Sequence, residues 1–318
     1  MRSLPILLFL VAAATARGSP PPVFVELESP RKSYFVGEPA PITLRLGLDR
    51  GFLETNLVPL FGRELDVQVQ IEAPGTEGLP GLELLPGSPD PEGAPRRSLV
   101  LNAEVTWARL AEDRVVAGRP FVVFELTRHL LPTRSGEVTI PGPVVRYAHA
   151  TRFAEDFITG RRPLDRREEL EKGDPLRLRL LELPREGRPP GFAGAVGEFA
   201  IEARAEPTVL ERGEILRLTL EIEGKGNRAR FPPPRLHDLP GFHLYGMIDD
   251  EKAPVRTVVY ELAPVGEGVE AIPAIPFTFF DPGPPAAYRV VKTRPIPLAV
   301  RSGSAPPAAR PPESEERT

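Results

Sequence analysis

The chain has 318 residues, of which 41% are hydrophobic, and a formal net charge of −4. This length allows two domains with separate cores, and the balanced charge offers no electrostatic footprint for nucleic-acid binding. The absence of cysteine excludes disulfides, thiol redox chemistry and cysteine-ligated zinc. Proline accounts for 41 residues. Because proline cannot donate to a β-ladder, this abundance favours many short strands over long helices.

The first sixteen residues are typical of an export signal. Arg2 gives a positive start, residues 4–14 form an apolar run, and Ala14-Thr15-Ala16 is a small-x-small cleavage site. The apolar run is shorter than the roughly 20 residues that span a bilayer. We therefore expect residues 1–16 to be removed and the product to be exported; an uncleaved anchor is the alternative. At the other end, the polar, proline-bearing residues 301–318 are expected to form a disordered tail.

A strand–turn–strand pattern recurs in the two halves of the chain. In each half an alternating strand is followed by a proline, a Gly-Glu pair, a longer alternating strand and the pattern P-x-x-x-G-x-x-x-I-P. The first copy contains Gly37, Glu38, Pro132, Gly136, Ile140 and Pro141, and the second contains Gly213, Glu214, Pro264, Gly268, Ile272 and Pro273. The repeat carries no reactive group, which indicates tandem modules built for binding.

In the first half, period-two alternation predicts strands at residues 23–28, 42–48, 67–71, 98–107, 121–126, 144–147 and 176–180. Residues 74–95 are rich in proline and glycine and predict a long exposed loop. The charged run 161–172 has helical leanings, as a solvated turn of helix or a basic docking patch. Trp107 and the phenylalanines are assigned to the core.

The first copy also contains an insertion. Gly37 and Pro132 are 95 positions apart, whereas Gly213 and Pro264 are 51 apart. About 44 extra residues therefore fall within residues 49–97, where Phe52 and neighbouring apolar residues predict a satellite core or an exposed patch for a partner.

In the second half, strands are predicted at residues 199–203, 216–222, 258–262, 277–280 and 296–300, with a hairpin turn at residues 223–227. About seven short strands in roughly 100 residues with regular turn signals are typical of an Ig-like β-sandwich. The predicted fold class is all-β, with tandem Ig-like sandwiches at residues 17–190, which include the insertion, and 191–300.

The search for chemistry yields no catalytic, cofactor or metal site. Residues 224–229 satisfy a loose G-x-G-x-x-A pattern, but three prolines follow, so no helix can present its N-terminus to a pyrophosphate. There is no G-x-S-x-G elbow, and Ser135 in the repeated turn is replaced by Glu267 in the second copy. We therefore predict a non-enzymatic protein, with a hydrolase on an unusual sandwich scaffold as a remote alternative.

The sequence also gives little evidence for a metal site. The histidines His129, His149, His237 and His243 lack the helical i, i+4 spacing of a zinc pair. His237 and His243 share one loop with Asp238, where an adventitious metal is conceivable. The acidic run 249–251 could attract calcium, but the alternating ligand ladder of a calcium loop is missing.

Residues 183–199, with Leu183-Pro184, Gly187, Phe192 and Gly194-Ala195-Val196-Gly197, closely resemble the inter-domain signature of the BatD-like oxygen-tolerance family. The resemblance covers most of residues 23–300 and continues through six further groups of residues: Gly213-Glu214, Gly226-Asn227 with Pro232-Pro233-Pro234, Gly241-Phe242, Tyr260, Pro264 with Gly268 and Ile272-Pro273, and Phe280-Asp281-Pro282. These motifs are structural rather than catalytic.

The resemblance implies tandem Ig-like sandwiches in the periplasm or on the outer face of a bacterial inner membrane. It further implies work with von Willebrand factor A domain membrane proteins and a MoxR-type ATPase in aerotolerance or envelope stress. Such proteins usually carry a transmembrane helix after the sandwiches, and none is found up to Thr318. This chain is then either a soluble member or incomplete; a soluble member reaches the ATPase only through a membrane partner. A module that binds carbohydrate or another surface polymer is the alternative function.

Overall fold

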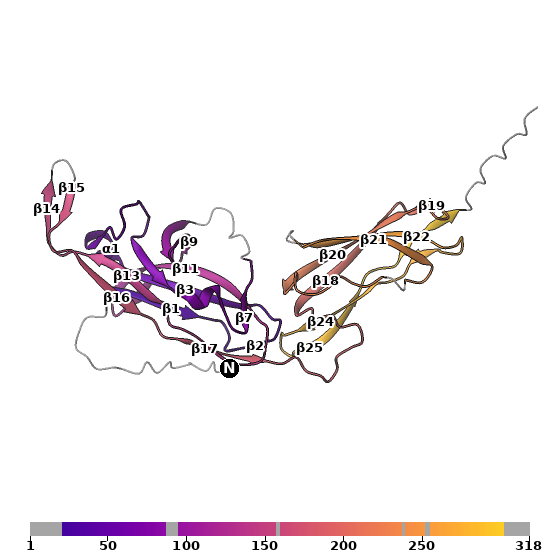
Figure 1. Ribbon diagram of the computed structural model, residues 1–318, viewed down its shortest axis with the longest axis horizontal. Coiled ribbons are helices and arrows are strands. Elements are labelled where there is room, and N and C mark those ends of the chain that lie inside the picture. The colour runs from indigo at the N-terminus through magenta and orange to yellow at the C-terminus, as the bar shows by residue number, and fades with distance from the viewer. Residues whose placement is uncertain (1–20, 87–94, 157–159, 237–238, 252–254, 302–318) are drawn as a thin grey trace, which may run out of the picture.

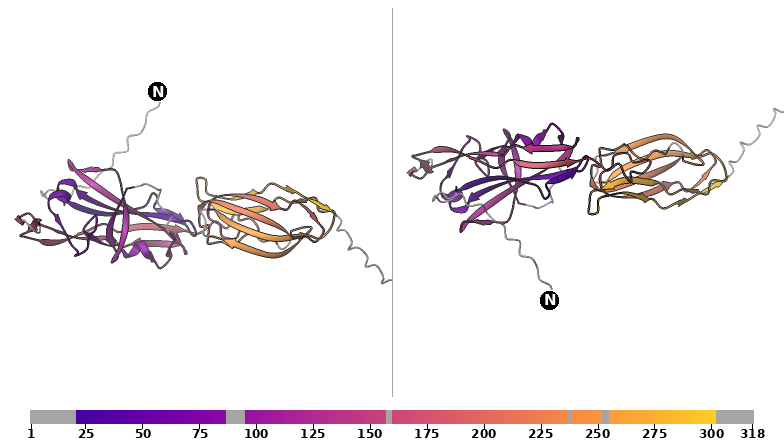
Figure 2. Two further views of the ribbon diagram at one scale, coloured as in Figure 1. Left: turned by 90° about the horizontal axis from the view of Figure 1, so that it is seen from above. Right: turned by 90° about the horizontal axis from the view of Figure 1, so that it is seen from below.

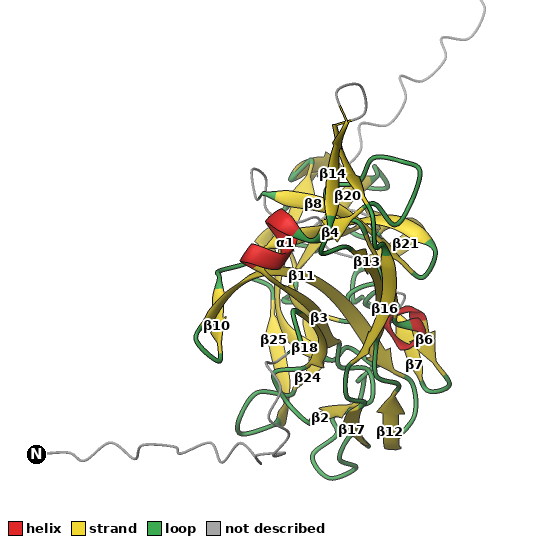
Figure 3. Ribbon diagram, turned by 90° about the vertical axis from the view of Figure 1, so that its left-hand side faces the viewer, coloured by secondary structure: helices red, strands yellow, loops and turns green. Residues whose placement is uncertain are grey.

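The computed structural model describes residues 21–86, 95–156, 160–236, 239–251 and 255–301. The all-β prediction is confirmed, because the described part of the chain contains 27 strands beside one α-helix and one 3-10 helix (Figure 3). None of the described helices is long and apolar enough to cross a membrane. The predicted signal peptide and residues 302–318 of the predicted tail lie outside the described residues.

The strands form two lobes that lie end to end (Figures 1 and 2). The N-terminal lobe contains β1 (Val23–Glu28), β2 (Ser33–Phe35), β3 (Ala40–Asp49), α1 (Arg50–Thr55), β4 (Leu57–Val58), β5 (Val69–Glu72), η1 (Pro74–Glu77), β6 (Gly78–Leu79), β7 (Leu82–Leu84), β8 (Arg96–Leu101), β9 (Glu104–Leu110), β10 (Arg114–Val116), β11 (Arg119–Pro132), β12 (Gly136–Ile140), β13 (Val144–His149), β14 (Phe153–Asp156), β15 (Gly160–Pro163), β16 (Arg167–Lys172) and β17 (Leu176–Leu181). The C-terminal lobe contains β18 (Gly197–Glu206), β19 (Val209–Glu211), β20 (Leu216–Gly226), β21 (Phe242–Asp250), β22 (Arg256–Pro264), β23 (Ala271–Ile272), β24 (Pro276–Asp281), β25 (Ala287–Lys292), β26 (Ile296–Pro297) and β27 (Ala299–Arg301).

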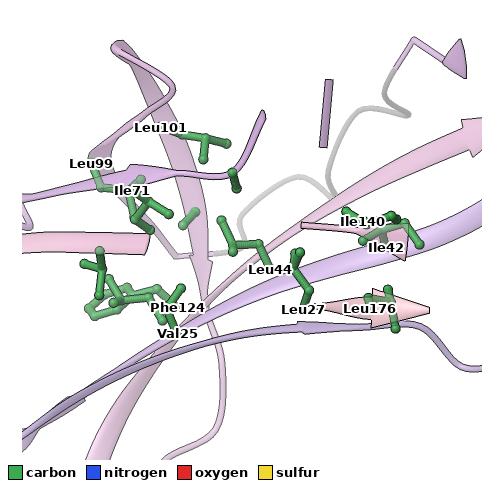
Figure 4. Packing of buried hydrophobic residues seen from close by; sticks show 14 of the residues in the cluster. Val25, Leu27, Ile42, Leu44, Ile71, Leu99, Leu101, Phe124, Ile140 and Leu176 are labelled. Atoms are coloured by element: carbon green, nitrogen blue, oxygen red, sulfur yellow. The ribbon is translucent and has the colours of Figure 1, made fainter. Parts of the chain in front are cut away.

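Each lobe has its own hydrophobic core, as the alternating strands require. In the N-terminal lobe every second residue of β1 and of most of β3 is buried, and these side chains meet those of β5, β8, β11, β12 and β17. Figure 4 shows Ile42, Ile140 and Leu176 close together in this core. The C-terminal core is built in the same way on β18, β20 and β22, with phenylalanines of β24.

The two lobes share one pattern of strand pairing. The antiparallel order β1-β3-β11 in the first corresponds to β18-β20-β22 in the second. In each lobe the short second strand pairs in parallel with the last one, β2 with β17 and β19 with β27. The strand that ends in the Ile-Pro of the repeated motif also pairs with a strand near the end of its lobe, β12 with β17 and β23 with β26. The sequence repeat is therefore a repeat of strand topology.

The prediction of a helical run at residues 161–172 is wrong. Residues of this run form β15 and β16, and β16 pairs along its whole length with β13, from Val144 opposite Lys172 to His149 opposite Arg167. Local charge favoured a helix here, but cross-strand pairing at the edge of the sheet determines the conformation.

Three further expectations also need correction. Residues 98–107 form the hairpin β8–β9 instead of one strand, and Trp107 on β9 is 55% exposed rather than part of the core. Residues 223–227 are no hairpin turn, because β20 continues to Gly226 and pairs with β18 up to Gly197. The described part of the loop at 74–95 contains η1, β6 and β7, and Thr76 and Leu82 are buried. Residues 87–94 of that loop lie outside the described residues.

The additional elements between β3 and β11 include α1, β4 and β5, which fall where the insertion was predicted. The Asp49 carboxylate caps α1 by accepting a hydrogen bond from the Phe52 backbone N–H (2.9 Å). Phe52 packs against the main core, whereas Val58 forms a small separate cluster with Ala148 and Ala150. The apolar residues of this segment thus serve packing, partly as a satellite core.

Candidate functional site

The repeated Gly-Glu pair closes a turn in the same way in both lobes. The Glu38 backbone N–H donates to the Phe35 carbonyl (2.9 Å), and the Glu38 carboxylate accepts from the Phe35 N–H (2.9 Å). Glu214 makes the same two bonds with Glu211, at 3.1 Å and 2.7 Å. The preceding glycine has φ of +84° at Gly37 and +86° at Gly213, a conformation that other residues rarely adopt. The pair is therefore conformational in both copies.

The environments of the two glutamates differ. Glu38 is buried and its carboxylate also forms an ion pair with Arg31. Glu214 is exposed. A charged group that is buried must be paired and hydrogen-bonded, so Glu38 carries a larger share of the stability of its lobe.

The P-x-x-x-G-x-x-x-I-P segments also occupy equivalent places. Pro132 and Pro264 end β11 and β22, Ile140 and Ile272 end β12 and β23, and both isoleucines are fully buried. Pro141 and Pro273 follow these strands immediately. The glycines differ: Gly136 begins β12 with φ of +130°, whereas Gly268 lies in a turn before β23. None of the twelve residues of the repeat gathers into a reactive group; they define strand ends and turns.

The Gly37 turn of the N-terminal lobe is the place where the C-terminal lobe contacts it. A Cβ atom at Gly37 would lie 3.0 Å from Val196 Cγ2 and 3.3 Å from Asn227 Nδ2. Beside this contact the Phe35 and Phe280 rings meet edge to face, with centroids 4.8 Å apart. Together these residues form an apolar junction between the lobes.

A charged contact completes the junction. Arg230 Nη2 lies 3.4 Å from Glu83 Oε2, so a cation of the C-terminal lobe meets a carboxylate on β7. We call the whole contact, defined by Phe35, Gly37 and Glu83 on one side and Val196, Asn227, Arg230 and Phe280 on the other, the lobe junction.

The connecting segment before β18 is anchored on the C-terminal lobe. Asn227 is buried and forms two hydrogen bonds with the Val196 backbone. Its side-chain Oδ1 accepts from the Val196 N–H (2.8 Å), and its backbone N–H donates to the Val196 carbonyl (3.1 Å). The Tyr288 hydroxyl donates to the Pro184 carbonyl (2.7 Å). The residues that carry the family resemblance between 183 and 199 thus position the connection.

The opposite end of the C-terminal lobe carries a depression of about 540 Å³. We call it the distal depression; its lining includes Arg212, Gly213, His243, Tyr245, Pro264 and Val265. Glu267 lines it as well, so charges of both signs surround the exposed Tyr245 and Val265 side chains. Two residues of the repeated motif, Gly213 and Pro264, lie in its wall.

Among the described residues the most deeply buried charge is Arg256, which the sequence search did not single out. Its side chain is 1% exposed and donates to both Asp249 oxygens (2.9 and 2.5 Å) and to the carbonyls of Arg228 and Phe231 (2.8 and 2.7 Å). Arg256 also contacts Glu251 at 3.4 Å. Two carboxylates of the run considered for calcium therefore balance an internal cation. The signal in the sequence was an arginine in register with the buried Val258, Tyr260 and Leu262 of β22.

A second ionisable cluster lies on β13 and β16. Glu169 accepts from the Tyr147 hydroxyl (3.1 Å) and lies 3.0 Å from His149 Nε2. The His149 hydrogen bond holds the pKa of Glu169 below its usual value, while burial raises the pKa of Tyr147. The Phe52 ring contacts the rings of both Tyr147 and His149, with centroids 5.7 Å apart in each pair, so the cluster ties α1 to the sheet.

The remaining histidines are dispersed. His129 lies on β11, where burial lowers its pKa, and His243 lies in the wall of the distal depression. His237 and Asp238 of the suggested metal loop lie outside the described residues. Within the described ranges no three histidines or carboxylates are grouped so that they could hold a metal ion.

Comparison with other proteins adds no name to these features. The chain matches no protein-family model, and no curated protein is significantly similar to it in sequence.

Proposed function

We propose that the chain is a non-enzymatic, exported scaffold protein made of two tandem Ig-like β-sandwich domains, residues 17–190 with an insertion and residues 191–300. The observation that carries the proposal is the use of the repeated residues: Glu38 and Glu214 close equivalent turns, and Ile140 and Ile272 fill equivalent core positions. A repeat whose residues are occupied with folding leaves binding to the surfaces, as in other tandem sandwiches.

The partner class follows from the resemblance to BatD-like proteins. We propose that von Willebrand factor A domain membrane proteins bind the chain on the outer face of the inner membrane, and that the MoxR-type ATPase is reached only through them. Sheet edges or inter-strand loops are the surfaces for such contacts. β21, which ends the order β18-β20-β22-β21, offers such an edge and exposes Tyr245, Met247 and Ile248.

Recovery of a tagged chain from envelope fractions tests the proposal. Mild detergent extracts are purified on the tag and the bound proteins are identified by mass spectrometry. We expect enrichment of a von Willebrand factor A domain protein, and a mature N-terminus near Arg17. Recovery of a partnerless monomer, or a chain that retains residues 1–16 in the cytoplasm, would contradict the proposal.

The alternative, binding of a carbohydrate or another surface polymer, has weaker support. Sugars stack on exposed aromatic platforms, and the two large exposed aromatic residues among the described residues, Trp107 and Tyr245, belong to different lobes. A glycan array separates the two functions: signal on the array would favour the alternative, and a blank array would remove it.

A further inference from the structure

The lobe junction provides an internal template for a contact that the chain makes with itself. Two turns with the same hydrogen bonds, at Gly37 and Gly213, stand at corresponding ends of the lobes. The correspondence extends around them. The Val36 N–H donates to the Leu181 carbonyl (2.8 Å) and the Arg212 N–H to the Arg301 carbonyl (3.0 Å). The matched bonds allow the residues of the two ends to be equated one by one.

The neighbouring strands match as well. The Thr133 N–H donates to the Gly81 carbonyl, and the Val265 N–H donates to the Gly241 carbonyl, both at 3.0 Å. Two residues further along each strand, Glu83 pairs with Leu131 in one lobe and His243 pairs with Ala263 in the other. His243 is therefore the structural equivalent of Glu83, and Arg212 is the structural equivalent of Val36.

The distal depression is thus the counterpart of the surface that the junction covers in the N-terminal lobe. There, Val196 lies against Gly37, and Arg230 pairs with Glu83. In the C-terminal lobe the counterparts, Gly213 and His243, line the depression. Among the described residues, the same surface is covered in one copy and open in the other.

Exposed apolar side chains are concentrated around this open end. Twelve large hydrophobic residues are exposed among the described residues. Four of them lie at this end, Val209, Ile215, Tyr245 and Val265, and Met247 and Ile248 follow further along the edge strand β21. In the N-terminal lobe the positions of Val209 and Val265 are taken by Ser33 and Thr133. Exposed apolar side chains gathered at one end of a domain are typical of a site of protein interaction.

We propose that the distal depression is the docking site for the end of a β-sandwich domain of another protein, in the geometry that the C-terminal lobe uses on the N-terminal lobe. The inference rests on the proposed scaffold function and locates its binding surface. The occupant presents an apolar side chain toward Gly213, as Val196 does toward Gly37. It also carries charged groups beside that side chain, because Arg212, His243 and Glu267 line the rim.

Site-specific photo-cross-linking in the native envelope tests this docking site. Benzoylphenylalanine replaces Tyr245, which is 59% exposed and therefore tolerant of substitution, in the otherwise complete chain. Matched probes replace Val290 on β25 and Val115 on β10, which are 50% and 70% exposed. We expect an adduct from position 245 whose cross-linked peptide lies in a loop at the end of a β-sandwich domain of another protein.

A second substitution probes the wall of the depression. With the probe at position 245, Val265→Glu is expected to reduce the adduct at least tenfold, whereas the matched control Val290→Glu leaves it unchanged. Far-UV circular dichroism checks that each variant is folded. Equal yields from the two variants would overturn the docking site.

Other outcomes separate the docking site from the scaffold function. An adduct between position 245 and residues 302–318 of the same chain, or with a second copy of the chain, would overturn the proposed occupant. Capture of a protein from position 115 or 290 but none from 245 would refute the docking site and leave the scaffold function standing. No adduct at any position, together with recovery of a partnerless monomer, would refute both.

Discussion

Replacement of Arg256 by methionine isolates the contribution of the buried cation to the C-terminal lobe. Methionine retains most of the apolar stem but removes every donor. The Phe231 and Arg228 carbonyls then lose partners at 2.7 and 2.8 Å, and Asp249 loses a bidentate partner. An unsatisfied buried polar group costs about 1–3 kcal/mol. The Asp249 side chain is 19% exposed and regains some water, which limits its share.

The expected total is a loss of about 3–5 kcal/mol in the free energy of unfolding, the usual cost of removing one partner of a buried ion pair. A surface pair in the same lobe provides the control. Arg289 lies 2.6 Å from Asp281 but is 49% exposed, so Arg289→Met should cost no more than about 1 kcal/mol. For a lobe of this size the difference corresponds to a shift of at least about 8 °C in Tm.

The assay uses the position of the single tryptophan. Trp107 lies in the N-terminal lobe, so its fluorescence reports on that lobe, while far-UV circular dichroism reports on both. Because the lobes have separate cores, urea unfolding of Arg256→Met should show an earlier transition by circular dichroism and an unchanged one by fluorescence. A midpoint equal to that of Arg289→Met would refute the reasoning.

Three further outcomes are expected. Glu38→Ala should cost about 2–3 kcal/mol and Glu214→Ala less than about 1 kcal/mol, because only the first removes a buried carboxylate that is paired with a cation; equal losses in urea titrations would contradict this. Burial lowers the pKa of His129, so the folded state binds fewer protons than the unfolded state, and the free energy of unfolding should fall as pH drops through about 6.5. His129→Gln should flatten that part of the pH profile; an unchanged slope between pH 5 and 8 would count against it. Trp107→Ala should cost less than about 1 kcal/mol by circular dichroism, because the ring is largely exposed; a core-sized loss would reinstate the assignment made from sequence.

Alternation of apolar and polar residues was sufficient to predict a strand where that strand buries one face. The strands around Leu44, Leu178, Leu218 and Tyr260 were all predicted because their apolar residues recur every second position against the core. The hairpin β8–β9 was missed because its turn is built on Asn102 and Ala103, both with positive φ. Hairpin turns of this conformation usually contain glycine, so this dipeptide gives little signal.

The edge strands were harder to predict for a different reason. β16 has the sequence REELEK, in which most side chains are exposed, so neither face carries an apolar stripe. Its conformation comes from backbone pairing with β13, which is visible only once the sheet is assembled. The partner of Arg256 was also beyond sequence reasoning, because Asp249 lies on the neighbouring strand, across the connection between β21 and β22.

The repeat itself explains why a motif search finds no functional site in this chain. The residues that recur in both lobes, such as Gly37 and Gly213, are those that the turn conformation requires. Such residues stay the same whichever partner the lobe contacts. Under the proposed scaffold function, binding specificity comes from aligned positions that do not recur. His243 in the place of Glu83 is such a position: it changes the charge offered at one lobe end while the surrounding backbone bonds stay the same. In a duplicated β-protein, the differences between structurally equivalent residues are therefore the first place to look for a partner.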